Sequence, residues 1–381
     1  MHRDSKINIL MLTHDVSDPA TRRRVSMLVA GGAHVSLAGF RRSEFPIAEI
    51  EGCPVTDLGQ TSNGAFLQRI AAVLRTLFCL KSHRSLFDKA DVVVARNLEM
   101  LAVAVRGQSL TNLKPFIVYE VLDIHRLLLR RNIIGMGLRW LEGWLARRCA
   151  AIITSSPAFV ENYFDELSHA ALPIRIVENK VLDVHGTIEP LQDNKRADGP
   201  PWIIGWYGNL RCSRSLALLR AITMNSDGRV EVVIRGRPSL DQMPDFHKII
   251  DDTPGMRYLG TYKNPEDLPD MYKSIHFAWI IDLFEEGLNS TWLLPNRLYE
   301  GCAFGVVPLA LDGVETSHAM KSLHIGVTFT KPQESEFTQY FKTLTQDTYS
   351  GLVQAVAKIS PSTWICGQKE CEELVAWLRS L

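Results

Sequence analysis

The stretch that decides the fold class reads Leu293-Leu294-Pro295-Asn296-Arg297-Leu298-Tyr299-Glu300-Gly301 and continues as Gly305-Val306-Val307-Pro308-Leu309. It predicts a helix entered through Pro295, a tight glycine turn and a buried strand, because proline at a first helical turn costs no hydrogen bond. Asn296 and Arg297 then lie at the positive end of the helix dipole, where a phosphate binds well. Glu300, one turn on, can accept hydrogen bonds from vicinal sugar hydroxyls. The alternative is an ordinary α/β crossover with a surface ion pair.

Length and composition indicate a two-domain globular protein. A chain of 381 residues exceeds what one core usually organises. Its 46% hydrophobic and 22% charged residues are typical of soluble globular proteins. Lys+Arg and Asp+Glu are equal at 42 each, so no overall field attracts nucleic acid and we expect no nucleic-acid partner.

Cysteine usage and hydropathy indicate the cellular compartment of the protein. The seven cysteines are scattered without a C-x-x-C pair, and the first residues are polar, so we expect a reducing cytoplasm. No apolar run approaches the ~20 residues of a membrane span. The expected location is the cytoplasm, with peripheral attachment to the inner membrane as a further expectation that depends on one helix described below.

The first half of the chain alternates strands and helices. Apolar runs predict buried parallel strands at 7–12, 35–39, 54–58, 91–95, 116–121, 151–154 and 174–179. Ligands bind at the carboxyl ends of such strands, so the loop at 13–24 should meet a substrate, through Arg22 above all. Arg23 and Arg24 are interpreted as a solvated helix start. The glycine fingerprint of a dinucleotide site is missing here, which argues against an NAD enzyme.

Two strand tips in this half carry reactive side chains. Arg96 follows the strand at 91–95, and Asp123 and His125 follow the strand at 116–121. A carboxylate or imidazole in such a place can accept a proton from an attacking hydroxyl. The alternative is that Asp123 caps the next helix and His125 is a packed surface residue.

Residues 130–148 combine five arginines, two tryptophans and many large aliphatic residues. At helical spacing one broad apolar face forms, from Ile133, Met136, Trp140, Leu141 and Trp144. We interpret this helix as lying in the membrane interface, with arginines on anionic headgroups and tryptophans at headgroup depth. The alternative is a core helix of the first domain with its arginines on the solvated side.

A polar segment over 183–200 predicts a linker, and strand–helix alternation restarts after it. The domains are then 1–182 and 201–365, followed by a helix over 366–381 that can cross back to the first domain. The fold class is α/β, with two Rossmann-like doubly wound domains facing a cleft. Residues 208–211 are expected to form a turn after a strand.

The strand ends of the second domain carry groups suited to a nucleoside diphosphate. Glycine lets the backbone approach a phosphate, arginines can pair with a diphosphate, and a glutamate can hold a ribose. These candidate donor-binding residues are Gly208, Asn209, Arg211, Arg235, Asn289, Ser290, Asn296, Arg297 and Glu300.

The chain resembles the GT-B glycosyltransferases, most closely the family 4-type enzymes of bacterial exopolysaccharide and capsule assembly. The run Pro295–Glu300 with Gly305-Val306-Val307-Pro308 is similar to their Pro-x-[Lys/Arg]-x-[Phe/Tyr]-Glu…Gly-x-Pro segment. Gly205-Trp206-Tyr207-Gly208-Asn209 resembles the first loop of their C-terminal domain. Residues 18–24, 91–96 and 152–155 are similar to landmarks of their N-terminal domain.

This resemblance implies a hexosyltransferase whose second domain binds a UDP- or GDP-linked sugar through Arg211, Arg297 and the ribose ligand Glu300. The first domain would bind a lipid-diphosphate-linked saccharide acceptor at the inner face of the cytoplasmic membrane. Its acceptor contacts would be Asp18, Arg22 and Arg96. No cofactor and no metal is expected, since arginines and a helix dipole can stabilise the leaving diphosphate.

The sequence departs from the family at one position. Retaining members carry two glutamates separated by seven residues; the second matches Glu300, but the first is Trp292 here. Glu285 and Glu286 are near but at the wrong spacing. The departure favours inversion, for which Asp123 is the first choice of general base and His125 the second.

Two rival interpretations remain open. A nucleotide-sugar 2-epimerase would share the fold and the ribose-binding glutamate without needing a membrane-facing helix. A non-catalytic nucleotide-sugar-binding subunit would keep the fold without the chemistry, as the missing glutamate allows.

Overall fold

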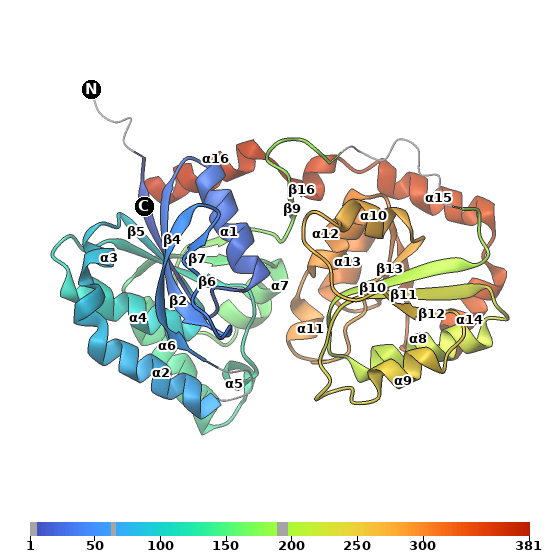
Figure 1. The fold of residues 1–381 in the computed structure, drawn as a ribbon, viewed down its shortest axis with the longest axis horizontal. Helices are drawn as coiled ribbons and strands as arrows, with labels where there is room; N and C mark the ends of the chain where they lie inside the picture. The colour runs from blue at the N-terminus through green and yellow to red at the C-terminus, as the bar shows by residue number, and fades with distance from the viewer. Residues whose placement is uncertain (1–5, 62–65, 189–196) are drawn as a thin grey trace. The chain divides into compact units, whose positions relative to one another are not determined.

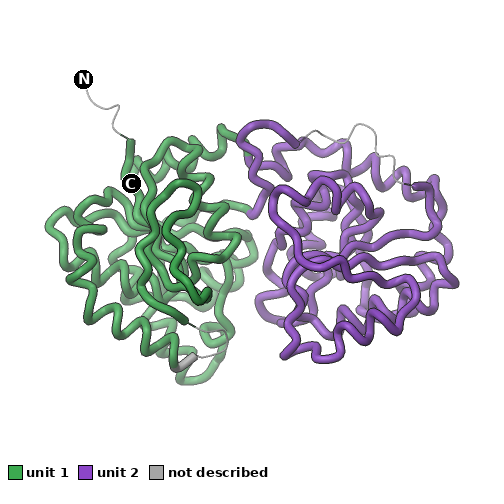
Figure 2. Tube along the Cα trace, viewed as in Figure 1, with its two compact units in different colours: residues 1–178, 367–381 green, residues 179–366 purple. Residues whose placement is uncertain are grey.

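The computed structural model describes residues 6–61, 66–188 and 197–381, which form two compact units (Figure 2). Unit 1 comprises residues 1–178 and 367–381, and unit 2 comprises residues 179–366. Residues 179–182 belong to unit 2 rather than to the first domain, because β9 (Val181–Leu182) pairs in parallel with β16 (Ile365–Cys366). Within the predicted linker, residues 189–196 lie outside the described residues.

Eight strands form the sheet in the described part of unit 1, in the order β3-β4-β2-β1-β5-β6-β7-β8 (Figure 1). The order reverses between β1 and β5, as in a doubly wound fold. Neighbouring strands pair in parallel except β3, which pairs antiparallel with β4 and was not predicted. The strands are β1 (Asn8–Thr13), β2 (His34–Arg41), β3 (Glu49–Ile50), β4 (Cys53–Gln60), β5 (Val92–Arg96), β6 (Phe116–Val121), β7 (Cys149–Thr154) and β8 (Ile174–Ile176).

Helices cover both faces of this sheet (Figure 1). Helix α4 packs against α2 and α6 on one face, and α1 packs against the C-terminal helix α16 on the other. A Cβ on Gly31, at the end of α1, would lie 2.3 Å from the carbonyl oxygen of Cys371, so glycine there allows α16 its close approach. The helices are α1 (Pro19–Ala30), α2 (Phe66–Cys79), α3 (Arg84–Asp88), α4 (Asn97–Leu110), α5 (Arg126–Leu129), α6 (Ile133–Ala146), α7 (Pro157–Phe159) and α16 (Gln368–Arg379).

Six parallel strands form the sheet in the described part of unit 2, in the order β12-β11-β10-β13-β14-β15. Large aromatic residues fill its core, among them the fully buried Trp202, Trp206 and Trp279. The strands are β10 (Trp202–Leu210), β11 (Val230–Pro238), β12 (Met256–Tyr258), β13 (Phe277–Trp279), β14 (Val307–Leu311) and β15 (Val327–Phe329). The helices are α8 (Ser213–Asn225), α9 (Phe246–Asp251), α10 (Leu268–Lys273), α11 (Asn289–Trp292), α12 (Asn296–Ala303), α13 (Glu315–Ser322), α14 (Glu334–Thr343) and α15 (Gln346–Ala357).

The turn predicted at 208–211 is wrong, because β10 continues to Leu210. Gly208 pairs with Gly236 of β11, and their φ angles are +104° and +137°. A Cβ on Gly236 would lie only 1.9 Å from the carbonyl oxygen of Gly208. Two facing glycines therefore let the strands stay paired in a backbone conformation closed to other residues.

The stretch at 293–309 folds as predicted. Pro295 occupies the N-cap position of α12, Gly305 turns the chain with a φ of +65°, and β14 follows as a buried strand. This places Asn296, Arg297 and Glu300 along the first turns of α12.

Candidate functional site

Glu300 is the central group at the carboxyl edge of the unit 2 sheet. It is 5% exposed, and its two carboxylate oxygens accept hydrogen bonds from Asn264 Nδ2 (2.9 Å) and Tyr272 Oη (2.8 Å). A carboxylate accepts about four hydrogen bonds in all. The two contacts therefore orient Glu300 without by themselves exhausting its acceptors, as the predicted ribose ligand requires.

Two of the predicted arginines, Arg211 and Arg235, lie far from their nearest carboxylates. Arg211 Nη2 lies 3.8 Å from Asp282 Oδ2, and the guanidinium lies 4.6 Å from the centre of the Phe284 ring. Arg235 Nη2 lies 3.7 Å from Asp267 Oδ2, and its buried Nε has no hydrogen-bond partner among the described residues. Contacts this long leave positive charge available to an anionic ligand.

The remaining predicted donor residues surround these groups. Asn209 and Asn296 are exposed, Arg297 is half-buried in the first turn of α12, and Asn289 and Ser290 are buried on α11. Ser290 lines a small pocket at the carboxyl ends of β13 and β14, together with Asp282, Leu293, Leu311 and Thr316. All predicted donor residues therefore lie in unit 2 at or near one edge of its sheet.

Sequence reasoning missed Tyr262, on the loop after β12. Its hydroxyl lies 3.9 Å from the position a Cβ on Gly208 would occupy. Burial and the charge of Glu300 raise the pKa of Tyr262 above its ordinary value, against the opposing charges of Arg297 and Arg235. No motif marked this residue, since only the folded sheet brings the loop beside β10 and α12.

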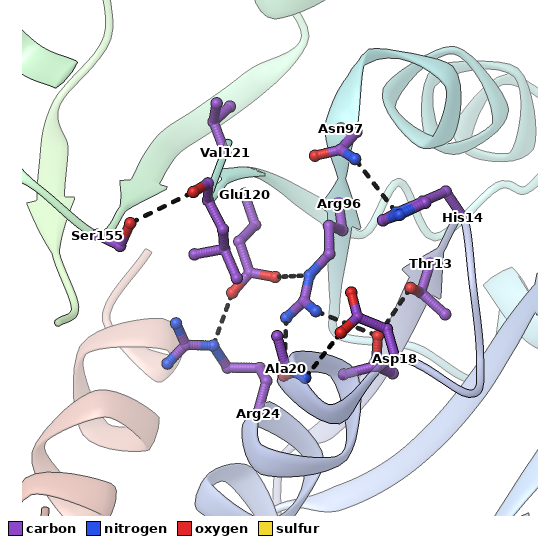
Figure 3. Close-up of polar contacts among 12 residues, drawn as sticks. Thr13, His14, Asp18, Ala20, Arg24, Arg96, Asn97, Glu120, Val121 and Ser155 are labelled. Carbon is purple, nitrogen blue, oxygen red and sulfur yellow. Dashed lines mark hydrogen bonds and ion pairs between the residues drawn. The ribbon is translucent and has the colours of Figure 1, made fainter. Parts of the chain in front are cut away.

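The corresponding edge of unit 1 holds a buried ionic network (Figure 3). Glu120 on β6 is fully buried and accepts hydrogen bonds from Arg24 Nε and Arg96 Nε, both at 2.6 Å. Arg96 also donates to Thr21 Oγ1 (3.1 Å) and to the carbonyl oxygen of Ala20 (3.3 Å). Burial opposes ionisation, yet the two arginines lower the pKa of Glu120 to about 2.

This network corrects the interpretation of Arg24 as part of a solvated helix start. Arg24 is 2% exposed because Glu120 pairs with it inside the fold. Arg96 is 1% exposed, which leaves it almost no surface with which to touch an acceptor. The structure thus gives Arg96 the role of holding the start of α1.

The other two predicted acceptor residues lie nearer the surface. Asp18 caps α1, with its Oδ1 accepting from the Ala20 N–H at 2.9 Å. Arg22 is well exposed and pairs with Glu51, Nε to Oε1 at 2.5 Å. Their contact with an acceptor stays a prediction.

The two candidate bases, Asp123 and His125, follow β6 on one loop. His125, not Asp123, caps the next helix, since its Nδ1 accepts the N–H of Leu127 at 3.3 Å. Partial burial lowers the pKa of His125. Because Nδ1 accepts the Leu127 N–H, the neutral ring carries its proton on Nε2 and has no lone pair there to accept another. Asp123 is exposed. This geometry favours Asp123 over His125.

His14, at the tip of β1, is a second titratable residue that sequence reasoning passed over. Its Nδ1 lies 3.1 Å from Asn97 Nδ2, and Asn97 adopts a positive φ of +69° at the tip of β5 (Figure 3). Loss of hydration lowers the pKa of His14. The pair therefore holds a neutral imidazole where the strand order of unit 1 reverses.

The apolar face of α6 points away from the unit 1 core. Trp140 and Trp144 are 65% and 51% exposed, and Ile133 and Met136 are exposed as well. The opposite face is buried, and its Glu142 accepts from Tyr119 Oη (3.0 Å), Tyr163 Oη (2.7 Å) and Ser168 Oγ (2.7 Å). The alternative, a core helix with its arginines on the solvated side, is therefore wrong, because the tryptophans lie on the exposed side and Arg139 is buried.

Among the described residues, no helix is long and apolar enough to cross a membrane. No group of three or more histidine, cysteine, aspartate and glutamate side chains in the same residues is arranged to hold a metal ion.

Comparison with known proteins decides the family. No protein-family model matches the chain. Succinoglycan biosynthesis protein ExoL of Rhizobium meliloti (strain 1021) is 45% identical over 378 residues, which cover 98% of this chain and 94% of that protein.

Solved structures share the fold at low sequence identity. Sucrose-phosphate synthase (tll1590) from Thermosynechococcus elongatus superposes with a TM-score of 0.72 at 11% identity, over 98% of both chains. Anabaena Alr3699/HepE in complex with UDP and glucose gives a TM-score of 0.69 at 15% identity, over 98% of this chain and 100% of that one. The predicted architecture is confirmed: the chain belongs to the family of the succinoglycan biosynthesis protein ExoL and has the fold of the GT-B glycosyltransferases.

Proposed function

We propose that this protein is a glycosyltransferase that moves a hexose from a UDP- or GDP-linked sugar to a lipid-diphosphate-linked saccharide during exopolysaccharide assembly. The family relationship supports the pathway class, since ExoL is a succinoglycan biosynthesis protein. The nucleotide-sugar donor is supported by the similarity to HepE, which was solved with UDP and glucose. The observation that carries the proposal is the oriented carboxylate of Glu300 near arginines whose own carboxylate partners are distant, at one sheet edge.

In this proposal unit 2 binds the donor. Arg211, Arg235 and Arg297 offset the charge of the diphosphate, which grows as the bond to the sugar breaks. Glu300 accepts hydrogen bonds from the ribose hydroxyls. Glu300 lies on α12 one turn after Arg297 at the helix N-terminus, so one bound donor can place its diphosphate at Arg297 and its ribose at Glu300.

Transfer with inversion is the chemistry we propose. The acceptor hydroxyl oxygen attacks the anomeric carbon, its proton passes to the Asp123 carboxylate, and the bond to the diphosphate oxygen breaks. The nucleoside diphosphate leaves with the bonding electron pair. Trp292 supports this choice, because an indole at the place of the family glutamate offers no carboxylate beside the sugar. Asp123→Asn should abolish transfer while donor affinity stays unchanged, and an active variant would remove Asp123 as the base.

We further propose that α6 rests on the inner face of the cytoplasmic membrane, where a lipid-linked acceptor resides. Its exposed tryptophans suit headgroup depth, and Arg130, Arg131 and Arg148 at its two ends are exposed and suit anionic headgroups. Helix α2 adds exposed apolar side chains on the same sheet face, at Ile70, Leu74 and Phe78.

A turnover assay with a panel of UDP- and GDP-sugars tests the reaction class. Slow release of nucleotide from a donor supports transfer. Interconversion of the sugar with the nucleotide retained would instead establish an epimerase, and binding without either would establish a non-catalytic subunit. The anomeric configuration of the product, read by NMR, decides between inversion and retention.

Vesicle co-sedimentation tests the membrane proposal. The chain should bind vesicles containing phosphatidylglycerol at low salt and release them as salt rises. Replacing Trp140 and Trp144 together by serine should weaken binding. Met224→Ser, which removes an exposed apolar side chain from unit 2, is the matched control and should bind like the parent chain. Absence of binding at low salt would refute the proposal.

A further inference from the structure

Four tyrosines lie around the carboxyl edge of the unit 2 sheet, and three of them have protein partners for their hydroxyls. Tyr207 donates to the carbonyl oxygen of Met271 (3.1 Å), and Tyr258 donates to that of Gly236 (2.8 Å). Tyr272 donates to Glu300 (2.8 Å). Tyr262, the fourth, is half-buried, and its hydroxyl makes no hydrogen bond to another described residue.

The backbone on both sides of Tyr262 is pinned. Arg235 Nη2 donates to the carbonyl oxygen of Thr261 (3.2 Å), and the Lys263 N–H donates to Asp267 Oδ2 (2.8 Å). Asn264 donates to Glu300 (2.9 Å). The loop therefore holds the unpartnered hydroxyl in place through contacts with two predicted donor residues, Arg235 and Glu300.

A tyrosine that serves only for packing would look different, and unit 2 contains one for comparison. The hydroxyl of Tyr340 on α14 also lacks a partner among the described residues, but the ring packs among Phe329 and Phe341 and only burial raises its pKa, to about 12. Around Tyr262 the charges of Glu300, Arg297 and Arg235 all act. The charges of Arg297 and Arg235 favour an anionic acceptor at this hydroxyl, against the charge of Glu300.

We propose that Tyr262 is a donor-binding residue whose hydroxyl donates a hydrogen bond to a diphosphate oxygen of the bound nucleotide. The geometry that carries this is the position of the Tyr262 hydroxyl beside Gly208 and the hydrogen bond from Arg235 to the preceding residue, Thr261. The inference rests on the donor site described under the proposed function. It adds a neutral donor to a site whose other phosphate ligands are arginines.

Titration calorimetry with UDP and with GDP tests this residue, using Tyr262→Phe and the matched control Tyr340→Phe. Tyr262→Phe should weaken nucleotide binding about tenfold, as expected for a lost hydrogen bond to a charged group. Its melting temperature should stay that of the parent chain, because the hydroxyl has no protein partner to lose. Tyr340→Phe should leave nucleotide affinity unchanged.

Three outcomes overturn the inference, and Arg297→Ala measured in parallel separates them. Unchanged affinity in Tyr262→Phe beside weakened binding in Arg297→Ala removes Tyr262 but keeps the donor site. A loss of affinity accompanied by a fall of several degrees in melting temperature makes the hydroxyl structural. If the parent chain binds neither nucleotide, or if neither variant changes binding, the donor site fails and the inference fails with it.

Discussion

The carboxyl edges of the two sheets carry similar residues in opposite states. In unit 1, Glu120 is buried and pairs with two buried arginines, Arg24 and Arg96, at 2.6 Å each. In unit 2, Arg211 and Arg235 are partly exposed and their nearest carboxylates lie 3.8 and 3.7 Å away. Both edges are where parallel sheets bind ligands.

The difference separates charges that hold the fold from charges that we propose bind the donor diphosphate. A buried charge must be paired, since leaving water costs it several kcal/mol. The unit 1 arginines meet that requirement with Glu120 and with the start of α1. The unit 2 arginines reach their carboxylates only at long range, so a diphosphate can improve their contacts.

Glu120→Gln should have the largest effect on the free energy of unfolding, because it removes the carboxylate that pairs the buried arginines of unit 1. The amide cannot neutralise two buried arginines, so we expect a loss of about 3–5 kcal/mol in the free energy of unfolding. Chemical denaturation followed by circular dichroism measures it. Glu142→Gln is the matched control, because hydroxyls hold Glu142 and can turn to accept from an amide. It should cost only about 1 kcal/mol, and equal losses in the two variants would contradict the special role of Glu120.

Acid should act on the same network with a somewhat smaller effect. The pKa of Glu120 is about 2 in the fold and about 4.3 in an unfolded chain. Because the folded value is the lower one, Glu120 stabilises the fold above pH ~4.3, and this stabilisation, on the order of 3 kcal/mol, is lost as the pH falls toward 2.

Glu142, in the same unit, should change the stability with pH in the direction opposite to Glu120. Burial raises its pKa, so its contribution is present below pH ~4.3 and is lost as the pH rises through the folded value. Denaturation profiles from pH 6 to 2 should therefore flatten on the acid side in Glu120→Gln. A profile as steep as that of the parent chain would show that another group governs acid unfolding.

Glu300→Ala sharpens the comparison on the unit 2 side. Removal of the ribose ligand should weaken donor binding by about 1.5–3 kcal/mol. Calorimetry with the donor identified by the turnover panel measures it. Because the variant also frees Asn264 and Tyr272, Glu300→Gln serves as a second variant that keeps one acceptor oxygen. Donor affinity unchanged in both variants would exclude the ribose from this position.

Arg22→Ala should have the smallest effect on the free energy of unfolding. It shows that the contribution of an arginine to stability depends on whether its side chain is buried. Arg22 lies two residues from Arg24 but is exposed and pairs with Glu51 at the surface. Exposed pairs contribute about 0–1 kcal/mol, so the free energy of unfolding should barely change. A loss of several kcal/mol would mean that Arg22 also belongs to the fold-holding network.

Much of the fold followed from local pattern. Apolar runs predicted most strands of both sheets, and a helix, turn and strand were predicted at 293–309 where the structure has α12, Gly305 and β14. The predicted turn at 208–211 was wrong, because a glycine in the sequence shows that unusual backbone angles are possible but does not show whether they form a turn or a distorted strand. Gly208 and Gly236 use that freedom to keep two strands paired, which depends on residues far apart in the chain.

The site was predicted less completely, because its chemistry depends on neighbours that the sequence does not place together. Glu300 and Arg297 were found from a motif on one helix. Tyr262 and His14 were not, since each gains meaning from loops and strands that only the folded sheet brings beside it.

By itself the sequence determined the class of the protein, two Rossmann-like domains of GT-B type, and it predicted a donor motif on α12. It also predicted an amphipathic helix within residues 130–148, because helical periodicity is a local property, and the structure has α6 there at Ile133–Ala146. Only the tertiary structure decided which face of α6 points away from the core, through the hydroxyls that bind Glu142 on the inner side. Only the tertiary structure could distinguish Arg22 from Arg24, since the partner that buries Arg24 lies 96 residues away in the chain.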